Sequence, residues 1–356
     1  MFPKNYVPTL AMRPSEMKGL EFLSGKIKDR MTPCILLAPW VGTSSLKRAI
    51  ERAEKAFPNR NYFLDIDRDY QYTNLDDPAQ KELNYLSDPA NWTEWIEFIK
   101  DSDHIFPCIQ VKGKSEIEIR QQIEATQKLG RQYCMRIEIN RFPDNFDKIV
   151  SAFTVAGSAD FTVILEGGWT ENVLSLSVWF DGLITGGLQR IDASIPVVVS
   201  CASIPKEFSR FSGISPVQFH NRQLVQQLQQ KSNRSSIIYG DWGSTRPREG
   251  NDFARLPKDR IDYPLDDTWY IVRNLNEGWD FKRAAQELIH NKEIWDDDLD
   301  TLGVEMIRRT ATIGKEIGID SSQKNTTSRV NIHLHRQALY GQDDTHGMSF
   351  DDDWED

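Results

Sequence analysis

The sequence predicts an α/β fold, most simply a (β/α)8 TIM-like barrel with C-terminal additions. Short apolar runs rich in β-branched residues recur along the chain with helical patterns between them, and several are apolar on both faces, as in a helix-covered parallel sheet. A length of 356 residues accommodates one barrel of about 250 residues plus additions. The eight runs cover residues 6–13, 33–40, 61–67, 104–111, 132–140, 161–168, 195–202 and 236–243.

Helical patterns separate these runs, and the alternation indicates the topology. One helix is expected to begin at Ser15, a suitable N-cap, and another to end at Gly130, a typical helix stop. Further helical patterns cover residues 44–57, 146–157 and 171–188. Strictly alternating strands and helices imply right-handed βαβ units, and eight of these close most simply into a barrel. An open doubly wound sheet is the alternative, although no GxGxxG motif follows the first run.

The pattern changes after residue 244. The additions expected there are a strand at 267–273, helices at 281–291 and 299–318, and a last strand at 329–337. Two longer connections, 68–103 and 203–235, each follow the C-terminal end of a run, where barrels elaborate their loops. We interpret residues 1–341 as one domain and residues 342–356 as a tail.

Composition and the absence of targeting signals indicate the compartment. Hydrophobic residues make up 39% of the chain and charged residues 27%, a globular balance that allows a large core. No apolar run approaches the roughly 18 residues of a membrane helix, and residues 1–17 lack a signal-peptide pattern. We therefore expect a cytoplasmic protein, in the host cytoplasm for a viral chain, with no membrane partner. Each cysteine lies in a different apolar run, which favours buried small hydrophobes over a zinc site: Cys34, Cys108, Cys134 and Cys201.

Carboxylates stand near the C-terminal ends of four predicted strands, where side chains ring the mouth of a barrel. The candidate catalytic residues are Asp65, Asp67, Glu138, Glu166 and Asp241. Such a ring could hold a divalent cation, Mg²⁺ or Mn²⁺, or supply a general acid and base. The alternative is structural: Arg136 pairs internally beside Glu138, and the aspartates cap the following loops.

Positive charge follows the eighth predicted strand. Arg246 and Arg260 bound an arginine-rich loop, and loops after strands seven and eight often bind phosphate in barrels. Because a planar guanidinium group suits phosphate oxygens, these two residues and Arg136 are candidate ligand-binding residues. A solvated loop that forms salt bridges with neighbouring carboxylates is the alternative.

Two histidines alternate in the predicted last strand. His333 and His335 would share a face there, and such a pair could ligate a metal, although two surface or hydrogen-bonded histidines are the alternative. The chain contains no GxSxG, HExxH, P-loop or kinase motif. Nucleophilic catalysis therefore has no recognisable signature.

Several segments occur in an order that resembles the "beta family" of phage and bacterial proteins, namely YVPTLAMRPSEM, MRIEI, YGDWGS, RIDYPLDDTWYIVR and RVNIHLHRQ. The family's pattern falls here on Tyr6, Pro8, Arg136, Gly240, Asp241, Arg260, Tyr263, Trp269, Arg273 and His335. The resemblance adds Tyr263 and His335 to the ligand-binding candidates and implies a phage–host or defence-associated role. The chain departs from the pattern at its end: Ser328-Arg329 and spaced histidines replace a Trp-Arg and adjacent histidines, which leaves the role of His335 open.

Two functions from different classes follow. The first is binding of a phosphate-bearing small molecule or nucleotide at the barrel mouth. If the carboxylates hold a metal ion, this function extends to metal-assisted phosphoester hydrolysis. The second is a non-enzymatic protein that binds a host or phage partner. The crowded polar mouth favours the first and the missing catalytic motifs favour the second. Nucleic-acid binding ranks below both, because the chain outside the tail has no large basic excess.

The formal charge of −10 lies mainly in residues 342–356, which carry seven acidic side chains and no Lys or Arg. Like charges at this density favour disorder of the free tail. Phe350 and Trp354 beside them could anchor the tail in a basic groove, either of a protein partner or of the chain's own arginine-rich loop.

Overall fold

A computed structural model describes residues 4–71, 74, 76–157, 160–248, 259–313 and 318–342. The acidic tail beyond Gln342 and the arginine-rich loop between Arg248 and Asp259 lie outside the described residues. The predictions of a disordered tail and of its docking through Phe350 and Trp354 therefore stay predictions. No helix in the described ranges is both long and apolar enough to cross a membrane.

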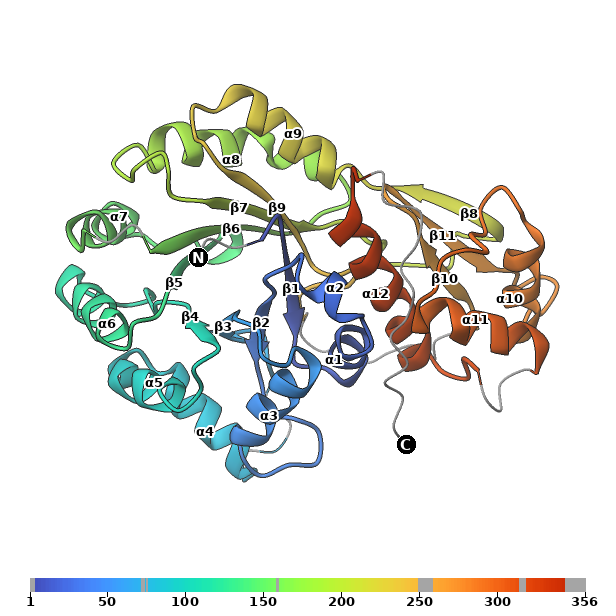
Figure 1. The fold of residues 1–356 in the computed structure, drawn as a ribbon, viewed down its shortest axis with the longest axis horizontal. Helices are drawn as coiled ribbons and strands as arrows, with labels where there is room; N and C mark the ends of the chain where they lie inside the picture. Colours follow the sequence, from blue (N-terminus) through green and yellow to red (C-terminus); the bar gives the residue numbers. More distant parts are fainter. Residues whose placement is uncertain are drawn as a thin grey trace.

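A sheet of parallel strands forms the body of the protein and confirms the predicted fold class (Figure 1). The eight strands found among the described residues are β1 (Tyr6–Ala11), β2 (Cys34–Leu37), β3 (Tyr62–Ile66), β4 (Ile105–Pro107), β5 (Tyr133–Glu138), β6 (Phe161–Trp169), β7 (Val197–Ala202) and β9 (Ile237–Asp241). Their order, β4-β3-β2-β1-β9-β7-β6-β5, places the two ends of the sheet at β4 and β5. These ends meet in a bridge between Cys108 and Cys134, where the Ile109 amide donates to the Cys134 carbonyl at 2.9 Å.

Helices between the strands cover the outside of the barrel. They are α1 (Pro14–Glu21), α2 (Gly25–Lys28), α3 (Lys47–Ala56), α4 (Pro78–Ser87), α5 (Trp92–Ile99), α6 (Glu116–Lys128), α7 (Phe146–Val155), α8 (Ser177–Gly182) and α9 (Asn221–Lys231). Local sequence explains their ends: α6 begins with a capping box between Ser115 and Glu118 and is followed by Gly130 at φ 68°.

Alternation along the strands separates two apolar cores. Residues such as Val7 and Ile238 point into the barrel, whereas their neighbours Tyr6 and Tyr239 pack outward beneath the helices. Alternate positions along a strand therefore face the barrel interior and the outer helical layer.

A smaller unit with its own apolar core lies beside the barrel (Figure 1). It contains the antiparallel strands β8 (Gly213–Gln218), β10 (Ile261–Pro264) and β11 (Thr268–Arg273), and the helices α10 (Phe281–His290), α11 (Leu302–Thr312) and α12 (Ser322–Leu339). The strand expected at 267–273 is present as β11. Strands β8 and β10 were not predicted, because β8 is only half-buried and contains Pro216, so it lacks a clear apolar alternation.

The predicted last strand at 329–337 is wrong, since these residues belong to helix α12. Val330 and Leu334 lie four residues apart and pack on the barrel core, while Ile332 packs in the smaller core. A helix buried on two sides shows apolar residues at every second position, which imitates a strand. Ser321 caps this helix by accepting a hydrogen bond from the Lys324 amide at 3.4 Å.

Candidate functional site

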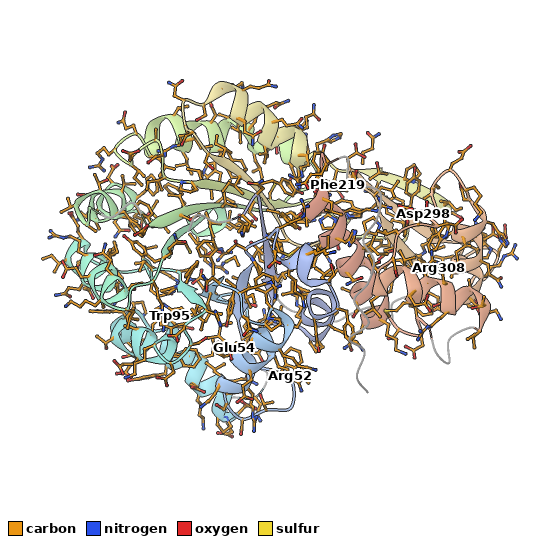
Figure 2. All side chains as sticks on the ribbon, in the orientation of Figure 1. Arg52, Glu54, Trp95, Phe219, Asp298 and Arg308 are labelled. Atoms are coloured by element: carbon orange, nitrogen blue, oxygen red, sulfur yellow. The ribbon has the colours of Figure 1, made fainter. Side chains whose placement is uncertain are left out.

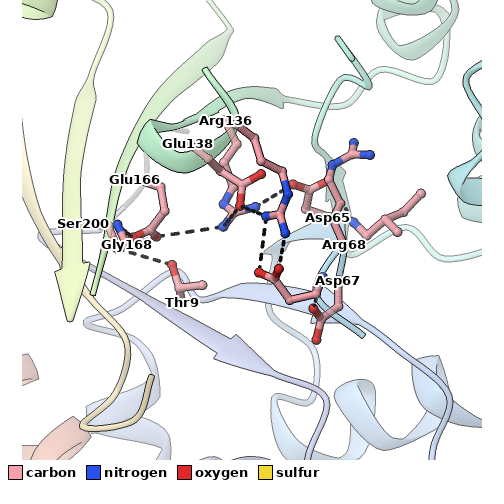
Figure 3. Close-up of polar contacts among 12 residues, drawn as sticks. Thr9, Asp65, Asp67, Arg68, Arg136, Glu138, Glu166, Gly168 and Ser200 are labelled. Carbon is pink, nitrogen blue, oxygen red and sulfur yellow. Dashed lines mark hydrogen bonds and ion pairs between the residues drawn. The ribbon is translucent and has the colours of Figure 1, made fainter. Parts of the chain in front are cut away.

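A buried arginine lies among carboxylates inside the barrel, near the C-terminal ends of the strands (Figure 3). The Arg136 guanidinium is 3.1 Å from Asp65, 3.2 Å from Glu138 and 4.0 Å from Glu166. The structure thus brings these four predicted site residues together. It also places a cation among the carboxylates, which is the structural alternative that the sequence left open.

Asp65 is held in its ionised form. Its carboxylate accepts hydrogen bonds from Arg136 at 3.1 Å and from the side-chain Nε2 of Gln110 at 3.0 Å. Burial works to raise the pKa of Asp65, but the positive charges of Arg68 and Arg136 and the hydrogen bonds outweigh it, so the pKa lies below its ordinary value. This aspartate is a charged partner for Arg136.

Glu166 behaves differently because its burial dominates. It is 2% exposed, and it accepts hydrogen bonds from the Gly168 amide and the Ser200 hydroxyl, both at 3.0 Å. Burial raises the pKa of Glu166 to about 7, although Arg136 and the hydrogen bonds oppose the shift. A carboxyl group that titrates near neutral pH is suited to general acid–base work.

The raised pKa of Glu166 makes a pH-dependent stability difference testable. In the folded protein this group keeps its proton up to about pH 7, whereas its ordinary pKa is 4.5. Its contribution to stability is therefore fully present below pH 4.5 and is lost as the pH rises through 7. Urea unfolding should measure this change in the free energy of unfolding. Relative to the parent, Glu166→Gln should be more stable at pH 8 than at pH 4 by about 3 kcal/mol. A pH-independent difference would contradict the shift.

Two other predicted carboxylates face elsewhere. Asp67 lies at the rim, where its carboxylate accepts a hydrogen bond from Arg248 at 2.5 Å; burial raises its pKa against this positive charge. Asp241 shares its strand face with the outward-packing Tyr239, so it points away from the barrel interior. The carboxylates at the strand ends therefore do not form one ring.

Asp241 instead accepts hydrogen bonds from four donors, and one of them, His333, connects the barrel to α12. Its carboxylate accepts hydrogen bonds from the hydroxyls of Tyr6 and Tyr239 and from Nε2 of His333, each at 2.7 Å, and from the Gly243 amide at 2.8 Å. Burial works to raise the pKa of Asp241, but His333 and the tyrosine hydrogen bonds outweigh it and lower the pKa.

The two histidines do not share a face, because α12 is a helix and residues two apart on a helix diverge. His333 contacts Asp241, whereas burial and the neighbouring Arg336 lower the pKa of His335 to about 4. Among the described residues, no group of three or more His, Cys, Asp or Glu side chains is arranged to hold a metal ion. All four cysteines are buried and free.

A cleft of about 580 Å³ opens at the C-terminal face of the barrel, against the smaller unit. Its walls follow strands β1, β3, β7 and β9 and include part of α12. Within the described part of the chain, five arginines line it, against two carboxylates, Glu16 and Asp69. The five are Arg13, Arg246, Arg248, Arg260 and Arg329.

One buried carboxylate serves two of these arginines. Asp262 is fully buried and accepts hydrogen bonds from Nε of Arg260 at 2.8 Å, from Arg329 and from Asn325 at 2.9 Å. Burial lowers the pKa of Arg329; Asp262 opposes this effect, and the positive charges of Arg260 and Arg246 add to it. Positive charge is thus concentrated at this wall beyond what its carboxylate neutralises.

Of the predicted ligand-binding residues, Arg246 and Arg260 line the cleft. Arg136 lies within the barrel, and Tyr263 is buried in the smaller core, where its hydroxyl is 3.4 Å from Arg336. Sequence reasoning missed Arg13 and Arg329 as cleft residues. Arg13 follows the first strand, and Arg329 lies in the segment that was predicted to be a strand but is helix α12. The packing of α12 on α1 brings the two arginines near each other.

These features define the class of protein: a (β/α)8 barrel with an arginine-lined cleft between its C-terminal face and an added α/β unit. The chain belongs to the Beta protein family, whose sequence profile matches residues 6–339. It is 25% identical over 357 residues to Protein beta of Enterobacteria phage P4, an alignment that covers 98% of this chain and 97% of that protein. Neither name states a reaction or a ligand.

Proposed function

We propose that the arginine-lined cleft binds a phosphate-bearing small molecule. The observation that carries this proposal is the gathering of five arginines around one cleft of about 580 Å³, which has the size of a small-ligand pocket. Guanidinium groups form paired, charge-assisted hydrogen bonds with phosphate oxygens.

The state of Arg329 supports an anionic ligand. This arginine is 6% exposed, shares Asp262 with Arg260, and its Nε has no hydrogen-bond partner among the residues that the structure describes. A phosphate group between these guanidinium groups would relieve their mutual repulsion and supply acceptors. We propose binding alone, because Asp65, Glu138 and Glu166 pair with Arg136 inside the barrel and do not line the cleft.

The test is calorimetric titration of the full chain with pyrophosphate, ATP and GTP, each with and without Mg²⁺. Arg260→Gln should weaken the binding of the best probe about 10- to 100-fold, because a hydrogen bond to a charged group contributes about 1.5–3 kcal/mol. Binding should also weaken steeply as the salt concentration rises.

Arg309→Gln is the matched control, because Arg309 is an exposed arginine of α11 that pairs with Glu305 at 2.6 Å. It should leave affinity unchanged. Two results would contradict the proposal: no probe binds the folded parent, or the two variants bind equally well. A chain that binds only a protein partner would support the non-enzymatic alternative.

A further inference from the structure

A small cavity lies beside the arginine-lined cleft, where the barrel meets the smaller unit. Its volume is about 10 Å³, and Ile204 and Thr245 line both it and the cleft. Its walls come from the ends of β7 and β9, from the start of α9, from β11 and from α12. Phe219, another lining residue, is labelled in Figure 2 where the barrel meets the smaller unit, and its ring stacks on Trp269 with 4.2 Å between centroids.

Four lining residues have a buried polar atom without a hydrogen-bond partner within the described ranges: Nε1 of Trp242, Oγ of Ser244, Nε1 of Trp269 and Nδ1 of His333. Trp242 packs in the interior cluster of the barrel beside Glu166, which leaves the atoms of Ser244, Trp269 and His333 for this cavity. Other polar side chains of the same wall are paired, since the Ser203 hydroxyl donates to Asn221 at 2.7 Å. Buried donors and acceptors are rarely left unpaired because each costs free energy. Three such atoms at one cavity indicate a bound molecule.

The hydrogen bonds at Asp241 indicate which atoms of the cavity wall are donors and which are acceptors for this molecule. The Asp241 carboxylate already accepts from two tyrosine hydroxyls and a backbone amide, so Nε2 of His333 donates its proton to an ionised group. In the imidazole tautomer that carries its proton on Nε2, Nδ1 is an acceptor, while Nε1–H of Trp269 is a donor. A molecule that accepts from Trp269 and donates to Nδ1 of His333 pairs both atoms, and water does both.

We propose that this cavity is a binding site for a single water molecule. The water accepts a hydrogen bond from Trp269, donates one to Nδ1 of His333, and exchanges a third with Ser244. A volume of about 10 Å³ is the smallest that holds one water, and two to four polar partners are usual for a buried one.

The water links elements that belong to different cores. Ser244 follows β9 of the barrel, Trp269 lies in the smaller sheet, and His333 lies in α12. The residue after Ser244 and two residues of α12, Thr326 and Arg329, line the cleft, so the water fixes the relative positions of two cleft walls. The water binds the protein whether or not the cleft holds the proposed ligand.

The first test is NMR of the full chain labelled with ¹⁵N-tryptophan, in which Trp269→Phe assigns the indole signal of Trp269. That indole proton should show cross-relaxation with a long-lived water, with NOE and ROE of opposite sign. A signal that persists in Ser244→Ala comes from the water itself, because a peak relayed through an exchanging serine hydroxyl would vanish there. Trp95 is the internal control: it is fully buried, and its indole donates to the Cys108 carbonyl at 3.2 Å, so it should show no such water.

A crystal structure of the parent at high resolution is the second test and needs no variant. It should show one solvent peak within hydrogen-bond distance of all three atoms. A cavity without density, a peak that refines as an ion, or Trp269 bonded directly to His333 would each overturn the proposal. So would the absence of the water signal at Trp269 in the parent.

Discussion

Replacing Arg136 with Met should destabilise the protein by about 3–5 kcal/mol. Arg136 is buried, and its removal leaves Asp65 and Glu166 buried without their counter-charge. The carboxylates can respond only by taking up protons, so the loss should shrink as the pH falls toward 4. Urea unfolding at pH 8 and pH 5 measures both effects.

The control for Arg136→Met is Arg48→Met, which removes an exposed arginine paired with Glu51 at 2.6 Å. Exposed pairs contribute about 0–1 kcal/mol, so this variant should remain close to the parent. Equal losses in the two variants, or a loss at Arg136 that does not depend on pH, would show that the buried charge cluster does not stabilise the barrel.

Replacing Asp241 with Asn should also destabilise the protein, again by about 3–5 kcal/mol. The amide keeps the shape of the side chain, but it removes the charge that accepts from Tyr6, Tyr239 and His333, and it turns one acceptor into a donor. Because His333 lies on α12, the loss should appear first as faster amide hydrogen exchange along that helix.

Asp298→Asn makes the same chemical change at an exposed aspartate of the smaller unit, and it should leave both stability and exchange unaltered. Protection of α12 that stays at the parental level in Asp241→Asn would mean that apolar packing alone holds the helix. That outcome would leave Asp241 without the connecting role described above.

The barrel could be predicted from sequence because its strands are buried on both faces and alternate regularly with helices. The smaller unit resisted prediction for two physical reasons. Helix α12 is apolar on two sides, since Val330 and Ile332 serve different cores, so its sequence has the periodicity of a strand. Strand β8 carries no such signal, because it is half-buried and, among the described residues, lies at the edge of its sheet beside β11.

The sequence showed that the candidate site residues lie near the ends of the strands. It did not show which face of the sheet each side chain occupies. Asp65 and Glu166 face the interior, whereas Asp241 faces outward, a difference that depends on strand parity. The cleft arginines were even harder to predict from the sequence. Arg13 and Arg329 are far apart in sequence and come together only because α12 packs against α1, where Gly19 allows Val330 to approach so closely that a Cβ on the glycine would lie 2.7 Å from it.

The position of α12 has a consequence for folding during synthesis. Tyr6 lies in the first strand, yet its hydroxyl bonds to Asp241, and the imidazole that shares this carboxylate follows some ninety residues later. A chain leaving the ribosome therefore carries all eight barrel strands before α12 can cover α1 and β1. Until then the nascent barrel exposes the apolar surface that Leu334 and Val330 later bury, which makes this stage the one most in need of a chaperone.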